Sequence, residues 1–274
     1  MVKAVFFDID GTLVSFDTHR VPDSARAAVQ ELRRRGVKVF IASGRHISSI
    51  DKLPDMQFDG FVLINGAMAM TCPSAGATAA QLSSPDFPGR EIIYRNPVPQ
   101  ADVHSWLDLL RHEQHSTVFV YEEGLMLNYL DDDMRQIMEL LDFPMPPAGD
   151  LETLRDHTIY QLITTFRDEE EARIMLHLPH CKTTRWHPLF TDIVNASTSK
   201  ALGIQSVLDY YGWQKEEVIA FGDGGNDLEM LDMVGTAVVM GNASPDVKSH
   251  ADYITDSVDN DGVAKALRHL GLII

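Results

Sequence analysis

The sequence predicts an α/β fold, in which a core built on a parallel β-sheet is interrupted by an inserted α+β unit. Near the N-terminus, short apolar runs without polar alternation take turns with helical patterns, as in a parallel sheet covered on both faces. The same order returns near the C-terminus, whereas helices and strand pairs fill the middle of the chain. We therefore predict a core of residues 1–97 and 188–274 and an inserted unit of residues 98–187.

Apolar periodicity defines the elements of the first core segment. Residues 2–7 predict a buried strand, and Asp23 and Ser24 can cap a helix that stops at Gly36. The apolar positions of this helix recur at helical spacing and are Ala25, Ala28, Val29 and Leu32. A strand, a short helix and a third strand are expected over residues 37–42, 46–53 and 61–64. This order predicts parallel strands joined by right-handed crossovers.

The remaining elements follow from the same patterns. Residues 71–99 are rich in Pro, Gly, Ser and Ala around one strand at 91–94, which indicates a long loop and a linker. The inserted unit is expected to contain helices at 102–111, 132–141 and 169–178 and strands at 117–121, 125–129, 159–166 and 182–186. The second core segment is expected to contain helices at 199–211, 227–234 and 263–270 and strands at 217–221 and 236–240.

Charge and composition exclude several classes of protein. The chain has 23 Lys and Arg against 40 Asp and Glu, a net charge of −17, which argues against a nucleic-acid partner. Cys72 and Cys181 form no CxxC pair, so neither a disulfide scaffold nor a zinc ribbon is indicated. No stretch reaches 18 apolar residues and no secretory signal precedes Asp8, so we expect a cytoplasmic protein without a membrane partner.

Two acidic motifs stand at the ends of predicted core strands. Asp8-Ile9-Asp10-Gly11-Thr12 ends the first strand, and Gly222-Asp223-Gly224-Gly225-Asn226-Asp227 ends the strand at 217–221. Parallel α/β sheets bind ligands at these carboxyl ends, and carboxylates crowded together are costly unless a cation binds there. Each motif alone also fits a polar turn, with Asn226 or Asp227 as a helix cap. The glycine spacing does not fit a dinucleotide-binding fingerprint.

Two further motifs can meet an anion. Ser43-Gly44-Arg45 follows the strand at 37–42 and offers a hydroxyl, backbone N–H groups and a helix N-terminus. Lys200 opens a predicted helix, where its charge opposes the helix dipole. A surface lysine is the ordinary alternative, but a lysine turned inward would offset the carboxylates. Each motif is weak alone, and only the four together are informative.

In this order, the four motifs resemble the haloacid dehalogenase (HAD) superfamily of phosphohydrolases. The long gap between Ser43 and Lys200 is similar to that of the Cof-like subfamily IIB, which carries a C2-type α/β cap on a Rossmann-like core. The resemblance covers the whole chain, and its finer matches are residues 41–45, 65–67, 199–200 and 222–231. The departures are the long segment at 71–89 and the short approach to Lys200 around Asn195.

The resemblance implies a role for each motif. Asp8 would be the nucleophile that forms an aspartyl phosphate, and Asp10 the general acid and base. The implied cofactor is Mg²⁺, held by Asp8, the Asp10 backbone carbonyl and Asp223, with Asp227 either a direct ligand or a residue that supports the ligands. The implied phosphate or substrate ligands are Ser43, Gly44, Arg45, Lys200 and Asn226.

The implied activity is Mg²⁺-dependent hydrolysis of small phosphomonoesters. Sugar phosphates are the expected substrates, with pyridoxal phosphate as another small phosphorylated metabolite. A sugar phosphomutase is the alternative enzyme, and dependence on glucose 1,6-bisphosphate would distinguish it. A catalytically silent binding module is disfavoured because every acid that the chemistry needs is present.

Overall fold

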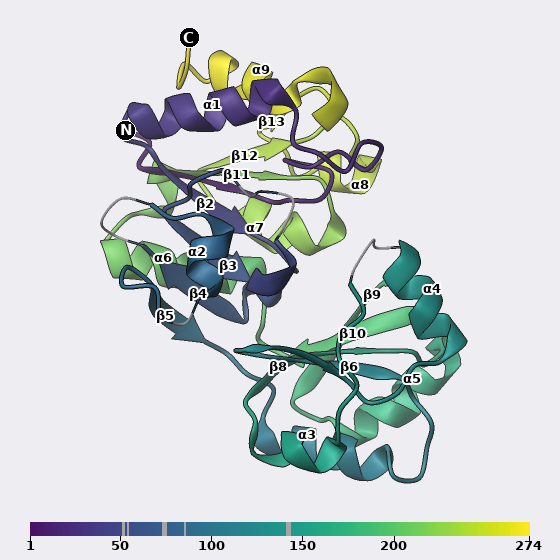
Figure 1. Ribbon diagram of the computed structural model, residues 1–274. Coiled ribbons are helices and arrows are strands. Elements are labelled where there is room, and N and C mark those ends of the chain that lie inside the picture. The colour runs from purple at the N-terminus through teal and green to yellow at the C-terminus, as the bar shows by residue number, and fades with distance from the viewer. Residues whose placement is uncertain (51–52, 54, 73–75, 85, 141–143) are drawn as a thin grey trace. The chain divides into compact units, whose positions relative to one another are not determined.

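The computed structural model describes residues 1–50, 53, 55–72, 76–84, 86–140 and 144–274 (Figure 1). The chain divides into two compact units, each with its own sheet. Unit 1 contains residues 1–95 and 199–274, and unit 2 contains residues 96–198. A parallel-sheet core with a segregated antiparallel unit is the α/β fold that the sequence predicts.

Unit 1 is built on an eight-stranded mixed sheet. In spatial order its strands are β13 (Tyr253–Ile254), β12 (Thr236–Val239), β11 (Val218–Gly222), β1 (Ala4–Phe7), β2 (Lys38–Ala42), β3 (Gly60–Leu63), β4 (Met68–Thr71) and β5 (Glu91–Arg95). The pairs from β13 to β3 are parallel, and β4 and β5 add antiparallel pairs at one edge. The central strand β1 is fully buried, as its unbroken apolar sequence predicts.

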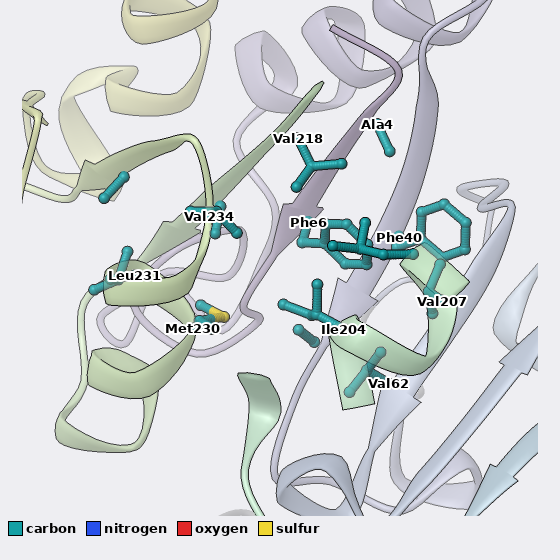
Figure 2. Packing of buried hydrophobic residues seen from close by; sticks show 14 of the residues in the cluster. Ala4, Phe6, Phe40, Val62, Ile204, Val207, Val218, Met230, Leu231 and Val234 are labelled. Atoms are coloured by element: carbon teal, nitrogen blue, oxygen red, sulfur yellow. The ribbon is translucent and has the colours of Figure 1, made fainter. Parts of the chain in front are cut away.

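Helices cover both faces of this sheet. They are α1 (Asp23–Arg34), α2 (Ala79–Ser83), α6 (Lys200–Tyr211), α7 (Leu228–Met233), α8 (Pro245–Lys248) and α9 (Gly262–His269). Figure 2 shows residues of α6 and α7, among them Ile204 and Met230, packed against Phe6 and Phe40 of the sheet. On the other face α1 contacts α9 (Figure 1). The four apolar positions predicted to face the core from α1 are all buried, which confirms the helical period.

Unit 2 is a five-stranded antiparallel sheet with helices. Its strands, in spatial order, are β7 (Gly124–Leu127), β6 (Thr117–Tyr121), β8 (Ile159–Thr164), β10 (Phe190–Asn195) and β9 (Cys181–His187). Its helices are α3 (Gln100–Leu109), α4 (Asp132–Leu140) and α5 (Asp168–Ile174). Trp106, Phe119 and Phe166 are fully buried in a core separate from that of unit 1. Unit 2 therefore has both a sheet and an apolar core of its own.

The structure corrects several sequence-based boundaries. The sequence predicts residues 188–198 in the core, but β10 pairs with β8 and β9 in the sheet of unit 2. The polar residues Thr191 and Asp192 interrupt the apolar pattern of this strand, so the sequence does not predict it, although both side chains are buried. The helix predicted at 46–53 is a short 3-10 turn over Ile47–Ser49. Residues 51–52 of this prediction lie outside the described residues, as does residue 141 of the helix predicted at 132–141. Within the described residues, every helix is too short or too polar to cross a membrane.

Candidate active site

Polar side chains gather where neighbouring strands of the unit 1 sheet end. Asp8 follows β1, Ser43 follows β2, and Asp223 follows β11. These three strands are adjacent in the sheet and run parallel, so their carboxyl ends meet at one edge. Asn242 stands shortly after β12, the next strand along. The predicted site residues therefore share the edge at which α/β sheets bind ligands.

Lys200 is buried among the acidic side chains. Its Nζ atom lies 2.6 Å from Oδ1 of Asp8 and 2.6 Å from Oδ1 of Asp227, and the side chain is inaccessible to solvent. Lys200 is the first residue of α6, and the Ser199 hydroxyl caps that helix by accepting from the Leu202 amide at 3.2 Å. The structure thus turns this lysine inward, and its two carboxylates compensate for its place at the positive end of the helix.

Gly66 fixes where α6 begins. This glycine has φ +93°, and a Cβ added to it would overlap the carbonyl oxygen of Ser199. A larger residue would therefore push the helix start, and Lys200 with it, away from the strand ends. The glycine of the Asn65-Gly66-Ala67 motif serves this close approach.

Asp227 holds the loop after β11 by hydrogen bonds to its backbone. It is completely buried, and its Oδ2 atom accepts the backbone N–H groups of Asp223 at 3.0 Å and Gly224 at 2.9 Å. Its other oxygen accepts from Lys200. Asp227 stands at the N-cap position of α7, but its side chain makes no capping hydrogen bond to that helix, because its oxygens bind Lys200 and the loop instead.

Asp223 is oriented by two residues that the sequence reasoning did not assign to the site. The Thr12 hydroxyl donates to Oδ1 of Asp223 at 3.0 Å, and the Asn242 amide donates to Oδ2 at 3.0 Å. Asn242 also donates to the Gly11 carbonyl at 2.9 Å, which joins the loops after β1, β11 and β12. Thr12 lies inside the first motif, but a lone asparagine in a loop gave no signal beyond its place after a strand.

The acidic residues carry more negative charge than the protein compensates. One oxygen atom from each of Asp8, Asp223 and Asp227 lies within 4.8 Å of the other two. With Asp10, these residues make four carboxylates against the two cations Lys200 and Arg45, a formal charge of −2. Burial raises the pKa of Asp8 well above its usual value despite Lys200, and burial together with Asp227 raises the pKa of Asp223 to about 7.

A hard divalent cation fits this donor set. Carboxylate oxygens are the ligands that Mg²⁺ prefers, and the charge of −2 equals the charge of one such ion with opposite sign. Asp8, Asp223 and Asp227 are the described residues whose oxygens converge closely enough to hold it. The raised pKa values reflect the cost of burying these acids together when no cation offsets them.

The side chain of Asp10 pairs with Arg45. Arg45 Nε lies 2.7 Å from Oδ2 of Asp10, and Arg45 Nη2 lies 2.8 Å from Oδ1, so the two side chains form a bidentate ion pair. The sequence predicted that Arg45 meets phosphate or substrate. In the structure its guanidinium pairs with Asp10, the predicted acid and base.

The remaining predicted ligands lie around the same strand ends. Ser43 is 2% exposed, and its Oγ accepts from the Arg45 backbone amide at 3.2 Å. Gly44 lies beside Asn65, where an added Cβ would stand 3.0 Å from the Asn65 side-chain oxygen. Asn226 donates its side-chain amide to that same oxygen at 3.1 Å. Asn65 therefore links the loops that carry Gly44 and Asn226.

Fold and site define a hydrolase, and the chain belongs to the haloacid dehalogenase-like hydrolase family, whose profile matches residues 5–267. Related proteins are named as phosphatases, and the chain is a phosphatase of this family. The presumptive phosphatase YkrA of Bacillus subtilis strain 168 is 34% identical over 99% of this chain and 98% of its own length.

Two solved structures are similar over the whole chain. The HAD subclass IIB sugar phosphatase BT4131 is 34% identical, with a TM-score of 0.84 over 99% of this chain and 100% of its own. The phosphatase BT1666 from Bacteroides thetaiotaomicron is 36% identical, with a TM-score of 0.85 over 100% of this chain and 96% of its own. These likenesses confirm the predicted HAD fold and the IIB resemblance.

Proposed function

We propose that the protein is a Mg²⁺-dependent phosphatase that hydrolyses small phosphomonoesters, sugar phosphates first among them, through an aspartyl phosphate on Asp8. The arrangement of Lys200 between Asp8 and Asp227, beside Asp223, carries the proposal. It combines an acid at a strand end with a buried cation and a set of oxygen donors for a metal. The sugar-phosphate preference is supported by BT4131, whose name gives sugar phosphatase as its activity.

In the first step, a carboxylate oxygen of Asp8 attacks phosphorus while the bond from phosphorus to the ester oxygen breaks. Lys200 holds the attacking carboxylate through the 2.6 Å bond to its Oδ1 atom. Two of the three ammonium protons serve Asp8 and Asp227, and in the proposal the third binds a phosphate oxygen. Asp10 gives its proton to the leaving oxygen, so the product leaves as an alcohol.

In the second step, water attacks phosphorus of the aspartyl phosphate, and Asp10 accepts the proton that the water loses. The bond from phosphorus to the Asp8 oxygen breaks, and inorganic phosphate leaves. In both steps the Ser43 hydroxyl, the Gly44 amide and the Asn226 side chain would hold the phosphate oxygens. When bound by Asp8, the Asp10 backbone carbonyl, Asp223 and Asp227, Mg²⁺ would neutralise charge on Asp8 and on the phosphate.

A screen of phosphorylated metabolites tests the proposal. Phosphate release is measured for sugar phosphates, pyridoxal phosphate and other small esters, with Mg²⁺ and after treatment with EDTA. We expect turnover only with Mg²⁺ and best with sugar phosphates. Asp8→Asn should remove turnover while leaving the fold intact, because Asp8 stands at a strand end. Asp17→Asn changes an exposed acid in the following loop and is the matched control.

Acid-quenched single-turnover samples give a second readout. A peptide containing Asp8 should gain the mass of a phosphoryl group in the wild type but not in Asp8→Asn. Residual activity of Asp8→Asn within about tenfold of the wild type would reject the covalent mechanism and indicate direct attack by water. Full activity in EDTA would reject the metal role of Asp223.

A further inference from the structure

Arg45 and Asp10 form a bidentate ion pair at the strand ends. The two nitrogen-to-oxygen distances of 2.7 and 2.8 Å join both carboxylate oxygens to one edge of the guanidinium. The Arg45 side chain is 11% exposed, whereas that of Asp10 is 36% exposed. A planar guanidinium that binds both oxygens fixes the plane as well as the position of the carboxylate. The more exposed Asp10 carboxylate is thus held by Arg45, whose side chain is largely buried.

The protein anchors Arg45 independently of Asp10. Arg45 Nη1 donates to the Ser49 carbonyl at 2.9 Å, and the Arg45 backbone accepts from the Ile64 amide at 3.1 Å and donates to Ser43 Oγ at 3.2 Å. These partners belong to the segments after β2 and β3, whereas Asp10 belongs to the loop after β1. Arg45 therefore fixes the Asp10 side chain to a neighbouring part of the sheet.

We propose that Arg45 is a positioning residue, which orients the Asp10 carboxylate toward the leaving-group oxygen, and that it does not bind the phosphate. The inference rests on the proposed function, in which Asp10 protonates the leaving alcohol. One edge of the Arg45 guanidinium already binds Asp10, and the Arg45 Nη1 atom already donates to the Ser49 carbonyl. A misplaced acid lowers the rate of the step that needs its proton, and misplacements of about 1 Å can cost ~100-fold. Binding of the phosphate itself would be unchanged.

Two substrates with different leaving groups separate the two roles of Arg45. The nitrophenolate of p-nitrophenyl phosphate leaves without a proton, whereas the alkoxide of a sugar phosphate needs one. For Arg45→Gln we expect the single-turnover rate of leaving-group release, which reports the first step alone, to fall by about 10- to 100-fold with the sugar phosphate and by less than about threefold with p-nitrophenyl phosphate. The ester concentration that gives half of the maximal single-turnover rate should change little for either ester. A phosphate-binding arginine would instead raise that concentration for both esters alike, and that result would overturn the proposal.

The double variant tests whether Arg45 acts through Asp10. In the first step Asp10→Asn should show the same leaving-group selectivity, and Arg45→Gln added to it should lower the single-turnover rate no further. A full additional loss in the double variant would overturn the proposal. Arg45→Lys keeps the charge but not the bidentate geometry, so its single-turnover rate with the sugar phosphate should be intermediate. This variant also provides the test if Arg45→Gln does not fold.

The controls separate this inference from the proposed function. If Asp10→Asn slows the single-turnover release of both leaving groups equally, Asp10 is not the acid and the proposed mechanism fails. If Asp10→Asn is selective but Arg45→Gln is not, only the positioning role fails. Arg33→Gln removes another arginine of the same unit, which pairs with Asp59 at the opposite, amino-terminal end of β3, and should leave both rates unchanged.

Discussion

Lys200 and Asp8 stand 192 positions apart in the chain, yet their side chains form a buried 2.6 Å ion pair. Two carboxylates share the lysine, since Asp227 lies at the same distance. A buried cation with two anionic partners stabilises the fold only as a set, because each unpaired charge would be costly to bury.

Lys200→Met should therefore destabilise the protein and remove its activity. Two buried carboxylates would lose their cation, and we expect the free energy of unfolding of the metal-free protein to fall by about 3–5 kcal/mol. Mg²⁺ should restore part of this loss without restoring turnover. Urea unfolding with and without Mg²⁺ measures both effects. Lys265→Met removes an exposed pair with Asp256 and should leave the free energy of unfolding nearly unchanged.

The stabilisation that Mg²⁺ provides should grow with pH. In the folded metal-free protein, burial raises the pKa of Asp223 to about 7 from an ordinary value of 3.8, so between these values the folded state binds more protons than the unfolded chain. The metal-free protein then loses stability as pH rises toward 7. Because Mg²⁺ displaces this proton, the increase of Tm on adding Mg²⁺ should be larger at pH 8 than at pH 5. Asp223→Asn should flatten the difference, and an equal increase at both pH values in the wild type would contradict the prediction.

Asn242→Ala should weaken Mg²⁺ activation. Asn242 orients a carboxylate that we expect to bind the metal, and loss of such a partner costs about 10- to 100-fold in metal affinity. The Mg²⁺ concentration at half-maximal activity should rise by that factor, while saturating Mg²⁺ recovers most of kcat. Asn260→Ala removes an exposed asparagine that donates to Ser257 and is the matched control. An unchanged Mg²⁺ requirement would show that Thr12 alone suffices to orient Asp223.

Gly66→Ala should displace the start of α6. The added methyl group would overlap the Ser199 carbonyl oxygen and would also strain a left-handed backbone, so we expect a loss of about 2–5 kcal/mol together with a large fall in kcat. Gly36→Ala is the matched control, because Gly36 has φ +81° but an added Cβ would meet none of the described atoms within 4 Å. It should cost only ~1–2 kcal/mol and leave kcat unchanged. Equal effects of the two substitutions would refute the steric role of Gly66.

We expect residues 96–198 to fold as an isolated domain. This segment is continuous, has its own five-stranded sheet and encloses its own apolar core around Trp106. A cooperative thermal transition followed by near-ultraviolet circular dichroism measures its folding. A fragment of residues 98–187 cuts away β10 and should fail to fold. A folded 98–187 fragment would show that β10 is dispensable for this sheet.

The core strands and the acidic motifs could be predicted because their signals are local. Residues 4–7 and 218–221 are unbroken apolar runs, and each is followed at once by its acidic motif. The meeting of Asp8, Asp223 and Lys200 then follows from the rule that ligands bind at the carboxyl ends of parallel strands.

The parts that escaped prediction depend on distant partners. The strand β10 contains Thr191 and Asp192 at buried positions, and only its pairing with β8 and β9 makes these residues extended. The direction of the Arg45 side chain depends on Asp10, which lies 35 positions away. Asn242 acquires its role only when the loops after β1, β11 and β12 come together.

The position of β1 in its sheet has a consequence for synthesis on the ribosome. One edge of β1 pairs with β2, which leaves the ribosome soon afterwards, but the other edge waits for β11, which begins at Val218. At about 5–20 residues per second, that second edge stays open for roughly 10–45 s after translation begins. Residues 96–198 can fold during this interval, while an unpaired apolar strand remains available to other nascent chains. The yield of folded protein in a cell is therefore expected to depend on translation speed and on chaperones that shield the N-terminal strand.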